Sequence, residues 1–489
     1  MLTVPINPND HRPIYEQIYL YIRDAITRGE LRESQKLPST RALADHLAVS
    51  RNTVAGAYDQ LLSEGYLTAR EKSGYYVSPI PGLIDQQPAV LSGTATAASE
   101  AADPPAAGTA AVPVRYDFRP NQFDPELFPY KHWNRLQTEV MRDAGPSLFS
   151  LGDRRGEPAL RKAIAAHLAA HRGFVCDPDH MIIGAGADYL LQLLSQCLSQ
   201  TASVAIEEPS YLKACRIFTG LGRTVCPISM DQSGMNPALL RKTEASVIYL
   251  TPSHQYPLGM IMPIGRKQAL LNWAKEDPSR IIIEDDHDSE FRYAGKPIPA
   301  LKGLDLNDQV VYIGTFSRSI APAIRIGFMV LPERLHAVYR SRLGHYASTV
   351  SRIDQTILAR FLADGSYERH VNRCRKIYRS RHDALLQVLQ DYGSEIILRG
   401  QNAGMHLAIS LRGTLPGESI AEKEDKIKEC LRSEGILVDT LHEYCMRAGG
   451  SDAYGPTILL GYGSLPGEKI QSGVRLLMQI LSRHSTETI

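Results

Sequence analysis

The N-terminal part of the chain places its apolar residues first with the period of a helix and then with that of a strand. Isoleucines recur at every fourth position of a first segment, at Ile14, Ile18, Ile22 and Ile26. Ser39 precedes the short segment TRALADHL as an N-cap, and Ser50 precedes a further helical segment, RNTVAGAYDQLLSEG. YLTAREKSGYYVS then alternates as two short strands do around a hairpin turn. Residues 1–78 are therefore predicted to form three helices followed by a hairpin.

Three helices and a hairpin are the elements of a winged helix-turn-helix, and polar residues occupy the positions that would read DNA. A recognition helix enters the major groove by its N-terminal end. Arginine pairs with guanine edges and asparagine with adenine edges, while nearby basic side chains hold phosphates. The predicted DNA-binding residues are Arg41, Ser50, Arg51, Asn52, Thr53, Arg70 and Lys72. Basic and acidic residues are equally numerous in residues 1–78, so a winged helix that does not bind DNA remains the alternative.

Residues 79–115 differ in composition from the chain on either side. They are rich in Ala, Pro, Gly, Ser and Thr and almost free of aromatic residues. Such a segment cannot bury enough apolar surface to offset the entropy lost on ordering it, which predicts a flexible linker. The linker separates the winged helix of residues 1–78 from a large block, residues 116–489.

The large block repeats a unit in which an apolar run is followed by polar residues and then by a helical segment. The runs are HMIIGAG, SVAIEEPSY, SVIYLTPSHQYPLG, RIIIEDDHDSE and QVVYIGTFSRS. Strands that alternate with helices predict an α/β domain with a mostly parallel sheet covered on both faces. In such folds, ligands bind at the carboxyl ends of the strands, which is where the polar residues gather. We expect a large part at about 116–370 and a small C-terminal part at about 371–489.

The polar residues that follow the strands suit a single cofactor pocket. Residues 184–188 (GAGAD) open a helix whose free N–H groups can hold a phosphate, although a plain strand-to-helix turn explains them equally well. Tyr211 offers a ring to cover a flat heterocycle, and Asp285 offers a carboxylate to a protonated pyridine nitrogen. A metal cluster in residues 284–288 is disfavoured, because one contiguous run cannot place several ligands around one ion. Further residues placed to surround a phosphate are Thr315, Ser317, Arg318 and Arg325.

The composition indicates the cellular compartment of the protein and not its function. A net charge of +1 argues neither for nor against nucleic acid, since a local basic face can exist within a balanced total. Seven cysteines without a C-x-x-C pair indicate free thiols in a reducing compartment. The N-terminus lacks the basic and apolar segments of a secretory signal, and no apolar run reaches membrane-spanning length. We therefore expect a cytoplasmic protein without a membrane partner.

The segment LPSTRALADHLAVSRNTVAGAYDQLLSEGYL, followed by the wing SGYYV, resembles the GntR class of bacterial regulators. The resemblance covers nearly all of residues 12–78. It implies that the chain binds a double-stranded DNA operator. Regulators of this class bind paired half-sites as dimers, so the resemblance also implies a homodimer.

The order of the polar motifs in residues 116–485 resembles the type I aminotransferase fold, whose members use pyridoxal 5′-phosphate. With the winged helix in front, the whole chain is similar to the MocR subfamily, in which an aminotransferase-like domain binds the effector. The resemblance implies that Tyr211 stacks on the cofactor ring and that Asp285 pairs with its pyridine nitrogen. Arg318 falls on the Schiff-base lysine, and His287 falls on a tyrosine that binds the phenolic oxygen. The phosphate-loop positions fall on Ala187, Asp188, Thr315 and Arg325.

Arg318 is the departure from this family that bears most on function. Lysine loses its proton in a partly buried site and attacks an aldehyde, whereas arginine stays protonated and cannot form the Schiff base. We therefore predict that the domain is not an enzyme. Other departures agree: Leu151 replaces a tyrosine that reaches a phosphate, and YPLG at 256–259 replaces N-P-x-G. GPT at 455–457 lacks a carboxylate-binding arginine, for which Arg447 is a nearby substitute.

Three functions stay open on these residues. In the favoured one, a regulator senses pyridoxal 5′-phosphate or its amino-acid adduct without a covalent bond, and Arg318 adds a charge-assisted hydrogen bond. In the second, the pocket has turned to another anionic effector. An active aminotransferase is the least favoured. Loss of the cofactor would leave the buried charge of Asp285 unpaired, which favours the first function over the second.

A small-molecule effector can change DNA binding only if it prefers one of two arrangements of the dimer. The linker is long enough for each winged helix to reach the effector domain of the other chain. We therefore expect a domain-swapped homodimer, in which the winged helix lies against the partner's effector domain.

Overall fold

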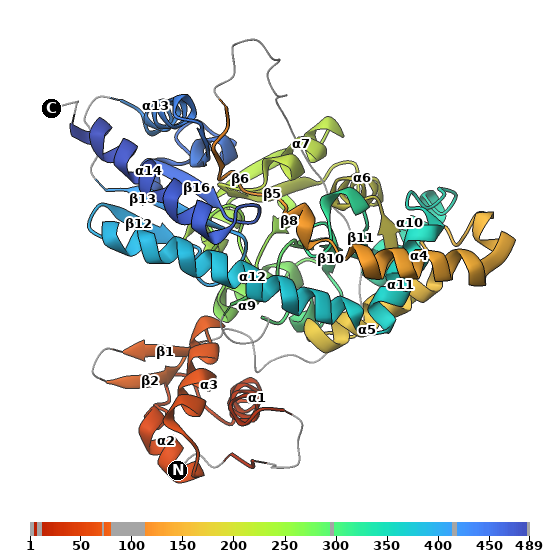
Figure 1. Ribbon diagram of the computed structural model, residues 1–489. Helices are drawn as coiled ribbons and strands as arrows, with labels where there is room; N and C mark the ends of the chain where they lie inside the picture. The colour runs from red at the N-terminus through yellow and green to blue at the C-terminus, as the bar shows by residue number, and fades with distance from the viewer. Residues whose placement is uncertain are drawn as a thin grey trace.

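The computed structural model describes residues 4–6, 12–70, 73–79, 113–293, 298–412 and 418–486. Within these residues, no helix is both long enough and apolar enough to cross a membrane. The N-terminal unit, red in Figure 1, is a winged helix-turn-helix. It consists of α1 (Ile14–Thr27), α2 (Thr40–Leu47) and α3 (Arg51–Ser63), followed by the antiparallel strands β1 (Leu67–Arg70) and β2 (Gly74–Val77).

Local interactions place the ends of these helices where the sequence predicts them. The hydroxyls of Ser39 and Ser50 each accept a hydrogen bond of 3.1 Å from a backbone N–H in the first turn of α2 and α3. Gly65 follows α3 with a φ of 77°, a conformation that glycine adopts without strain. Ile14 is 41% exposed, because it lies in the first turn of α1. The core of the unit contains the other three isoleucines, Ile18, Ile22 and Ile26.

The large part of the effector domain is built on one eight-stranded sheet, and the predicted mostly parallel arrangement is confirmed. In spatial order the strands are β4 (Met181–Gly184), β11 (Gly327–Val330), β10 (Val310–Thr315), β9 (Ile281–Asp286), β8 (Ala245–Leu250), β5 (Ser203–Glu208), β6 (Val225–Asp231) and β7 (Gly234–Met235). The pairs β10–β9, β9–β8, β8–β5 and β5–β6 are parallel. β11 and β7 run antiparallel to their neighbours.

Helices cover both faces of this sheet, as expected for strands that are apolar along their whole length. One face is packed against α6 (Ala187–Cys197), α7 (Leu212–Gly220) and α10 (Glu333–Arg342). The other face is packed against α5 (Pro158–His171), α11 (Arg352–Ala363) and, under β8 and β9, α9 (Ile264–Lys275). Two further helices are α4 (Tyr130–Ala144) and the short α8 (Pro237–Leu240).

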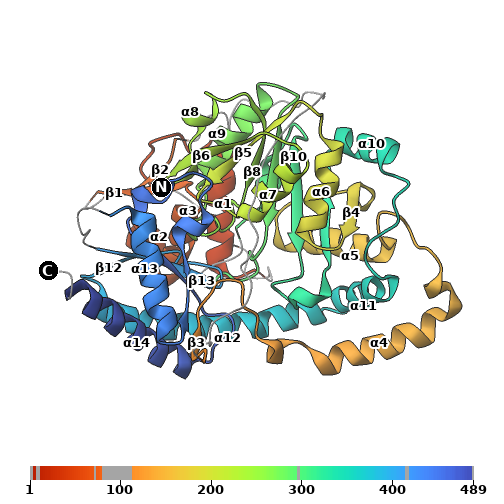
Figure 2. The same cartoon turned by 90° about the horizontal axis from the view of Figure 1, so that it is seen from above.

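The C-terminal part has a separate four-stranded antiparallel sheet with its own apolar core. Its strands, in order, are β12 (Ile396–Arg399), β13 (His406–Leu411), β16 (Thr457–Gly461) and β15 (Asp439–Thr440). The helices of this part are α12 (Ser366–Leu389), α13 (Ile420–Ser433) and α14 (Gly467–Thr486). The long helix α12 runs from α11 in the large part to α14 in the small part (Figures 1 and 2), so it joins the two cores.

Residues 116–118 belong to the small part, whereas the prediction placed all of residues 116–370 in the large part. β3 (Tyr116–Asp117) pairs in parallel with β14 (Ile436–Leu437), and Phe118 is fully buried in the core of the small part. This pairing joins segments more than 300 residues apart, so no local pattern in the sequence indicates it.

The winged helix packs on the effector domain of its own chain, below α9 in Figure 1. Ile264, at the start of α9, is buried in the core of the winged helix, and its backbone N–H donates to the carbonyl of Glu64 at 2.6 Å. Arg292 donates to the hydroxyl of Ser63 at 2.9 Å. Within this single chain the winged helix therefore lies on its own C-terminal domain, and a domain swap between the two chains of a homodimer stays a prediction. The contact within one chain arises because Ile264 supplies an apolar surface that closes the small core.

Replacing Ile264 with serine is expected to loosen the winged helix from α9, since a hydroxyl without a partner would replace buried apolar surface. Hydrogen exchange followed by mass spectrometry should then show faster exchange at the C-terminal end of α3. Lys275→Ser, at the exposed far end of the same helix, is the control and should leave exchange unchanged. Equal exchange rates in both variants would show that the contact at Ile264 does not hold the winged helix against α9.

Candidate functional site

Asp285, at the end of β9, is a buried carboxylate with one oxygen left without a partner. The hydroxyl of Tyr249, on the adjacent strand β8, donates to Oδ2 at 2.5 Å. Oδ1 has no hydrogen-bond partner among the described residues, and burial raises the pKa of the carboxyl group to about 7. A buried oxygen of this kind fits a ligand that brings a donor to it, such as a protonated pyridine nitrogen.

Asp286, the next residue on β9, is held on the opposite face of the sheet. Its Oδ2 lies 2.7 Å from Nε of Arg172 and accepts hydrogen bonds from Tyr312 and Ser289. Successive side chains of a strand point to opposite faces. The two carboxylates therefore cannot share one ion, and only Asp285 is available on the face covered by α6 and α7.

The stability of the protein without ligand should depend on pH through Asp285. The unfolded carboxyl group has a pKa of about 3.9, so as pH rises toward 7 the unfolded chain loses a proton that the folded chain keeps. The contribution of Asp285 to stability is thus lost as pH rises through the folded pKa, by up to about 1.4 kcal/mol per pH unit. Asp285→Asn should be more stable than wild type. The difference between their free energies of unfolding should grow from pH 5 to pH 7 and stay constant above pH 7.

Urea unfolding of both proteins from pH 5 to 8 measures this difference. Asp286→Asn is the comparison on the same strand and should destabilise the protein, because it removes the partner of the buried Arg172. An offset between Asp285→Asn and wild type that does not change with pH would contradict the pKa shift.

The loop between β4 and α6 forms a small cradle at a helix N-terminus. Gly186 has a φ of 86°, and a Cβ there would lie 2.8 Å from Nη2 of Arg325. The same nitrogen donates to the carbonyl of Ala185 at 2.9 Å and lies 3.3 Å from Asp188, which also binds Lys213 at 2.8 Å. Ala187 begins α6, whose first-turn N–H groups have no acceptor within the helix. The cradle joins a helix N-terminus to two cations and suits a phosphate.

Tyr211 belongs to a group of aromatic rings near Asp285, whose charge adds to burial in raising the pKa of the Tyr211 hydroxyl. Tyr211, the N-cap residue of α7, is half-buried, and its ring meets that of Tyr256 edge-on at 5.9 Å. The hydroxyl of Tyr256 accepts a hydrogen bond of 2.8 Å from Asn121 and donates to Tyr444 at 3.2 Å. The predicted stacking position of Tyr211 is thus part of an aromatic wall that includes residues from both parts of the domain.

His287 belongs to a group of buried histidines in the same region. Burial lowers its pKa to about 4, so its ring is neutral at pH 7. The neighbouring His254 has its Nδ1 3.0 Å from Asp288, while its Nε2 is buried without a hydrogen-bond partner in the described part of the chain. The ring centroids of His254 and His287 are 6.0 Å apart, and those of His254 and His406 are 5.3 Å apart.

Arg318 lies half-buried in the loop after β10 and faces these rings. Its positive charge adds to burial in lowering the pKa of His287, and it opposes the rise in the pKa of Tyr211 that burial causes. Among the described residues it makes no hydrogen bond or ion pair. Thr315, the last residue of β10, and Ser317, in the same loop as Arg318, are both half-buried. The guanidinium is therefore available to an anionic ligand.

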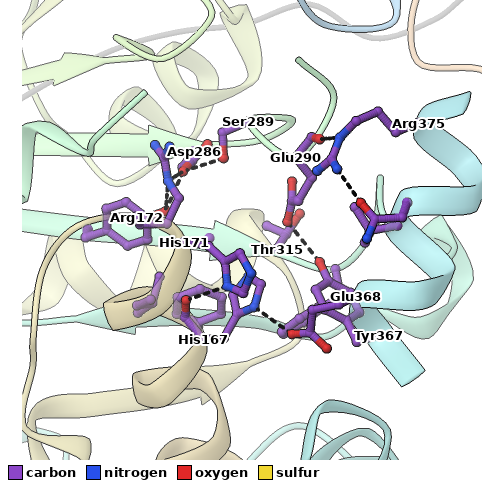
Figure 3. A pocket seen from close by; sticks show the side chains of 17 residues that line it. His167, His171, Arg172, Asp286, Ser289, Glu290, Thr315, Tyr367, Glu368 and Arg375 are labelled. Carbon is purple, nitrogen blue, oxygen red and sulfur yellow. Dashed lines mark hydrogen bonds and ion pairs between the residues drawn. The ribbon is translucent and has the colours of Figure 1, made fainter. Parts of the chain in front are cut away.

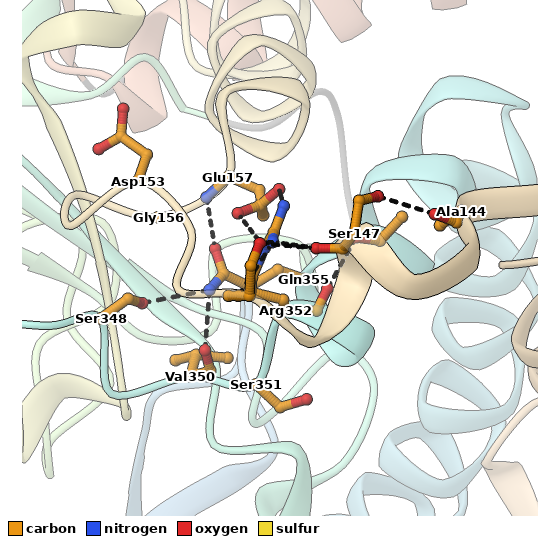
Figure 4. A network of polar contacts seen from close by, with 12 residues as sticks. Ala144, Ser147, Asp153, Gly156, Glu157, Ser348, Val350, Ser351, Arg352 and Gln355 are labelled. Carbon is orange, nitrogen blue, oxygen red and sulfur yellow. Dashed lines mark hydrogen bonds and ion pairs between the residues drawn. The ribbon is translucent and has the colours of Figure 1, made fainter. Parts of the chain in front are cut away.

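The loop that carries Leu151 is fixed, yet Leu151 itself points into solvent with 91% of its surface exposed. Arg352 donates to both carboxylate oxygens of Glu157, at 2.8 and 3.0 Å, and the side chain of Gln355 accepts from the backbone N–H of Glu157 at 2.7 Å (Figure 4). Arg447 is half-exposed and donates to the hydroxyl of Ser229 at 3.1 Å. Neither departure from the family pattern contacts Asp285 in this chain.

The predicted DNA-binding residues that the structure describes lie in α2, at the N-terminal end of α3 and on β1. Arg41, Arg51 and Asn52 are exposed, and Ser50 and Thr53 form the N-cap, with their hydroxyls 2.8 Å apart. Arg70 is exposed and lies over the ring of Tyr76, 4.5 Å from its centroid. The prediction for Lys72 lies outside the described residues.

Two residues that the sequence did not predict, Tyr249 and Asn121, each hold another residue of the site in place. Tyr249 binds Asp285 from the middle of β8, and Asn121 binds Tyr256 from a segment 135 residues away. Tyr249 lies inside an apolar strand, where tyrosine is ordinary, so only the pairing of β8 with β9 identifies it.

Comparison with known proteins agrees with the two units of the fold. Residues 14–77 match the family "Bacterial regulatory proteins, gntR family", and residues 121–452 match "Aminotransferase class I and II". The chain is 24% identical to an archaeal alanine:glyoxylate aminotransferase of known structure, with a TM-score of 0.66 over 76% of this chain and 91% of that one. At this identity the likeness shows the fold alone.

Two relatives that match most of this chain are regulators by name. The probable rhizopine catabolism regulatory protein MocR of Rhizobium meliloti is 32% identical over 83% of each chain. The HTH-type pyridoxine biosynthesis transcriptional regulator PdxR of Corynebacterium glutamicum is 32% identical over 95% of each chain. The match therefore covers most of the length of both relatives. The chain belongs to the MocR-type branch of the GntR family, transcriptional regulators in which a helix-turn-helix unit is joined to an aminotransferase-like domain.

Proposed function

We propose that this regulator senses pyridoxal 5′-phosphate, or its adduct with an amino acid, through non-covalent binding in the effector domain. The observation that carries the proposal is the buried oxygen of Asp285 that lacks a partner. A site that had abandoned the cofactor would keep this carboxylate at an energetic cost without a compensating bond. When bound, the cofactor supplies a protonated pyridine nitrogen, a phenolic oxygen, an aldehyde and a phosphate.

Each of these groups has a fitting residue around Asp285. Asp285 would hold the pyridine nitrogen and Tyr211 would cover the ring, while neutral His287 would bind the phenolic oxygen. The cradle of Ala187, Asp188, Thr315, Ser317 and Arg325 would hold the phosphate. Arg318 would hold an anionic group of the cofactor or of the amino acid and would leave the aldehyde unattached, because its guanidinium stays protonated.

A second candidate is a different anionic effector in the same pocket. The half-buried Arg318, without a hydrogen bond or ion pair to any described residue, favours this candidate, since an arginine matches a carboxylate or phosphate in two hydrogen bonds. An active aminotransferase is the weakest candidate, because the residue at the Schiff-base position is an arginine.

The proposal includes a double-stranded DNA operator and a homodimer that works in the cytoplasm, where the DNA is. Support for a dimer comes from large apolar side chains that are exposed on α4 and in the segment after it. Tyr130 and Met141 on α4, with Phe149 and Leu151 after it, are between 44% and 91% exposed. Apolar patches of this kind mark protein–protein contacts. The effector would then alter operator binding by favouring one arrangement of the two chains.

Calorimetric titration of dialysed full-length protein with pyridoxal 5′-phosphate tests the proposal. Wild type should bind one molecule per chain, and Asp285→Asn should bind about 10–100-fold more weakly, the loss expected for a hydrogen bond to a charged group. Asp391→Asn, an exposed aspartate outside the pocket, is the control and should bind as wild type does. Absence of binding to wild type would overturn the proposal and leave the anionic effector.

A further inference from the structure

A cavity of about 140 Å³ lies between α5, the ends of β9 and β10, and α12 (Figure 3). Its wall includes Asp286 and Tyr312, which belong to the face of the sheet opposite Asp285. The cavity thus lies mainly on the other face of the sheet from the proposed effector pocket, and Thr315 at the end of β10 borders it as well (Figure 3). Three side chains of types that bind metal ions meet at its edge. They are His167 and His171, one turn apart on α5, and Glu368 on α12.

The distance between His167 and Glu368 is that of two ligands around one ion, and His171 lies close to both. Nδ1 of His167 is 3.4 Å from Oε1 of Glu368, which is long for a hydrogen bond. Two atoms that each lie about 2.1 Å from a tetrahedral ion are about 3.4 Å apart. One ligand atom from each of the three residues lies within 4.8 Å of the others.

The backbone fixes the tautomer of His171, whose ring is stacked on that of His167 with the centroids 4.5 Å apart. Nδ1 of His171 lies 3.1 Å from the carbonyl oxygen of His167, one turn earlier in α5, so it donates there and Nε2 keeps its lone pair. Metal-binding histidines usually donate their other N–H to a carbonyl or carboxylate in this way. The ring of His167 is held edge-on against Tyr367, with centroids 5.2 Å apart.

The charge of the cavity favours a cation. Oε2 of Glu368 is buried and has no hydrogen-bond partner among the described residues. The cavity wall contains three carboxylates, Asp286, Glu290 and Glu368, against two guanidinium groups, Arg172 and Arg375. Arg172 is paired with Asp286 at 2.7 Å, and Arg375 donates to the backbone carbonyl of Glu290. Glu368 forms its ion pair with His167, and neither of these two guanidinium groups is paired with it.

We propose that His167, His171 and Glu368 bind one divalent transition metal ion, with zinc as the best fit and a fourth coordination position open to the cavity. Two imidazoles and one carboxylate are typical of zinc, whereas Mg²⁺ and Ca²⁺ prefer sites made only of oxygen atoms. The ion joins α5 of the large part to α12, the helix that continues into the small part. Metal binding therefore stabilises the junction of the two parts.

Zinc titration of full-length protein, first stripped with a chelator and dialysed, tests the site. Competition with a chromophoric chelator should give one zinc ion per chain, and zinc should raise the unfolding temperature. His171→Ala and Glu368→Gln should each weaken zinc binding by at least about 10–100-fold. Glu368→Gln keeps the shape of the side chain, so its folding is expected to match wild type. Cobalt in place of zinc should give the visible absorption of a tetrahedral site, and Glu368→Gln should lose it.

Two controls separate this site from other histidines. His345→Ala removes an exposed histidine elsewhere and should leave zinc binding unchanged. His180→Ala disrupts another group of close ligand atoms, that of His180, Glu333 and His336. Zinc binding that survives His171→Ala and Glu368→Gln, or that only His180→Ala abolishes, overturns the proposal. So does a stripped wild type that binds no zinc.

Discussion

Replacing Arg318 with lysine is expected to turn non-covalent binding of pyridoxal 5′-phosphate into covalent attachment. Arg318 follows β10 and faces the rings of Tyr211 and His287, so an amine placed there would reach the same space. Partial burial disfavours the protonated form of lysine, and a neutral amine attacks an aldehyde. Wild type should show no attachment, because a guanidinium keeps its proton at any pH at which the protein folds.

Mass spectrometry after borohydride reduction measures this change. Arg318→Lys should gain the mass of one cofactor per chain, and wild type treated in the same way should not. Arg216→Lys, an exposed position on α7, controls for attachment to any added lysine. If wild type binds the cofactor in the calorimeter while Arg318→Lys stays unmodified, the aldehyde does not lie beside residue 318. That result would remove the assignment of Arg318 to the Schiff-base position.

Loss of Arg51 or Asn52 is expected to abolish most of the sequence preference of DNA binding. Both side chains are exposed at the N-terminal end of α3, which the cap of Ser50 holds open. A side chain that pairs with a base edge contributes about 1–3 kcal/mol of discrimination, so each alanine variant should weaken binding to the selected site about 10–100-fold. Binding to unrelated DNA should change far less.

Selection of sites from random duplexes with wild type provides the operator for this measurement. Arg70→Ala should weaken binding to selected and unrelated DNA alike and reduce the dependence on salt, since it is placed to hold a phosphate. Arg28→Ala, at the end of α1 and bound to Glu30, removes a charge outside the predicted surface and should change neither. Equal loss on both DNAs for Arg51→Ala would assign that arginine to the backbone instead.

The two units and most of their elements follow from local patterns in the sequence. The N-caps at Ser39 and Ser50 begin α2 and α3, and the apolar run before Glu284 forms β9 in the centre of the sheet. These features depend on neighbours a few residues away, which is why periodicity and capping predict them. The place of Asp285 at the end of a buried strand follows from the same run.

Only the tertiary structure decided what each of these residues meets. The unpaired oxygen of Asp285 depends on Tyr249 binding the other oxygen from β8, and the edge of the second cavity brings together His167 and Glu368, 201 residues apart. The packing of Ile264 in the core of the winged helix and the pairing of β3 with β14 were not predicted, because both contacts join segments that lie far apart in the chain. Strand pairing and side-chain packing between distant segments depend on the shape of the whole core, and no short window of sequence contains that shape.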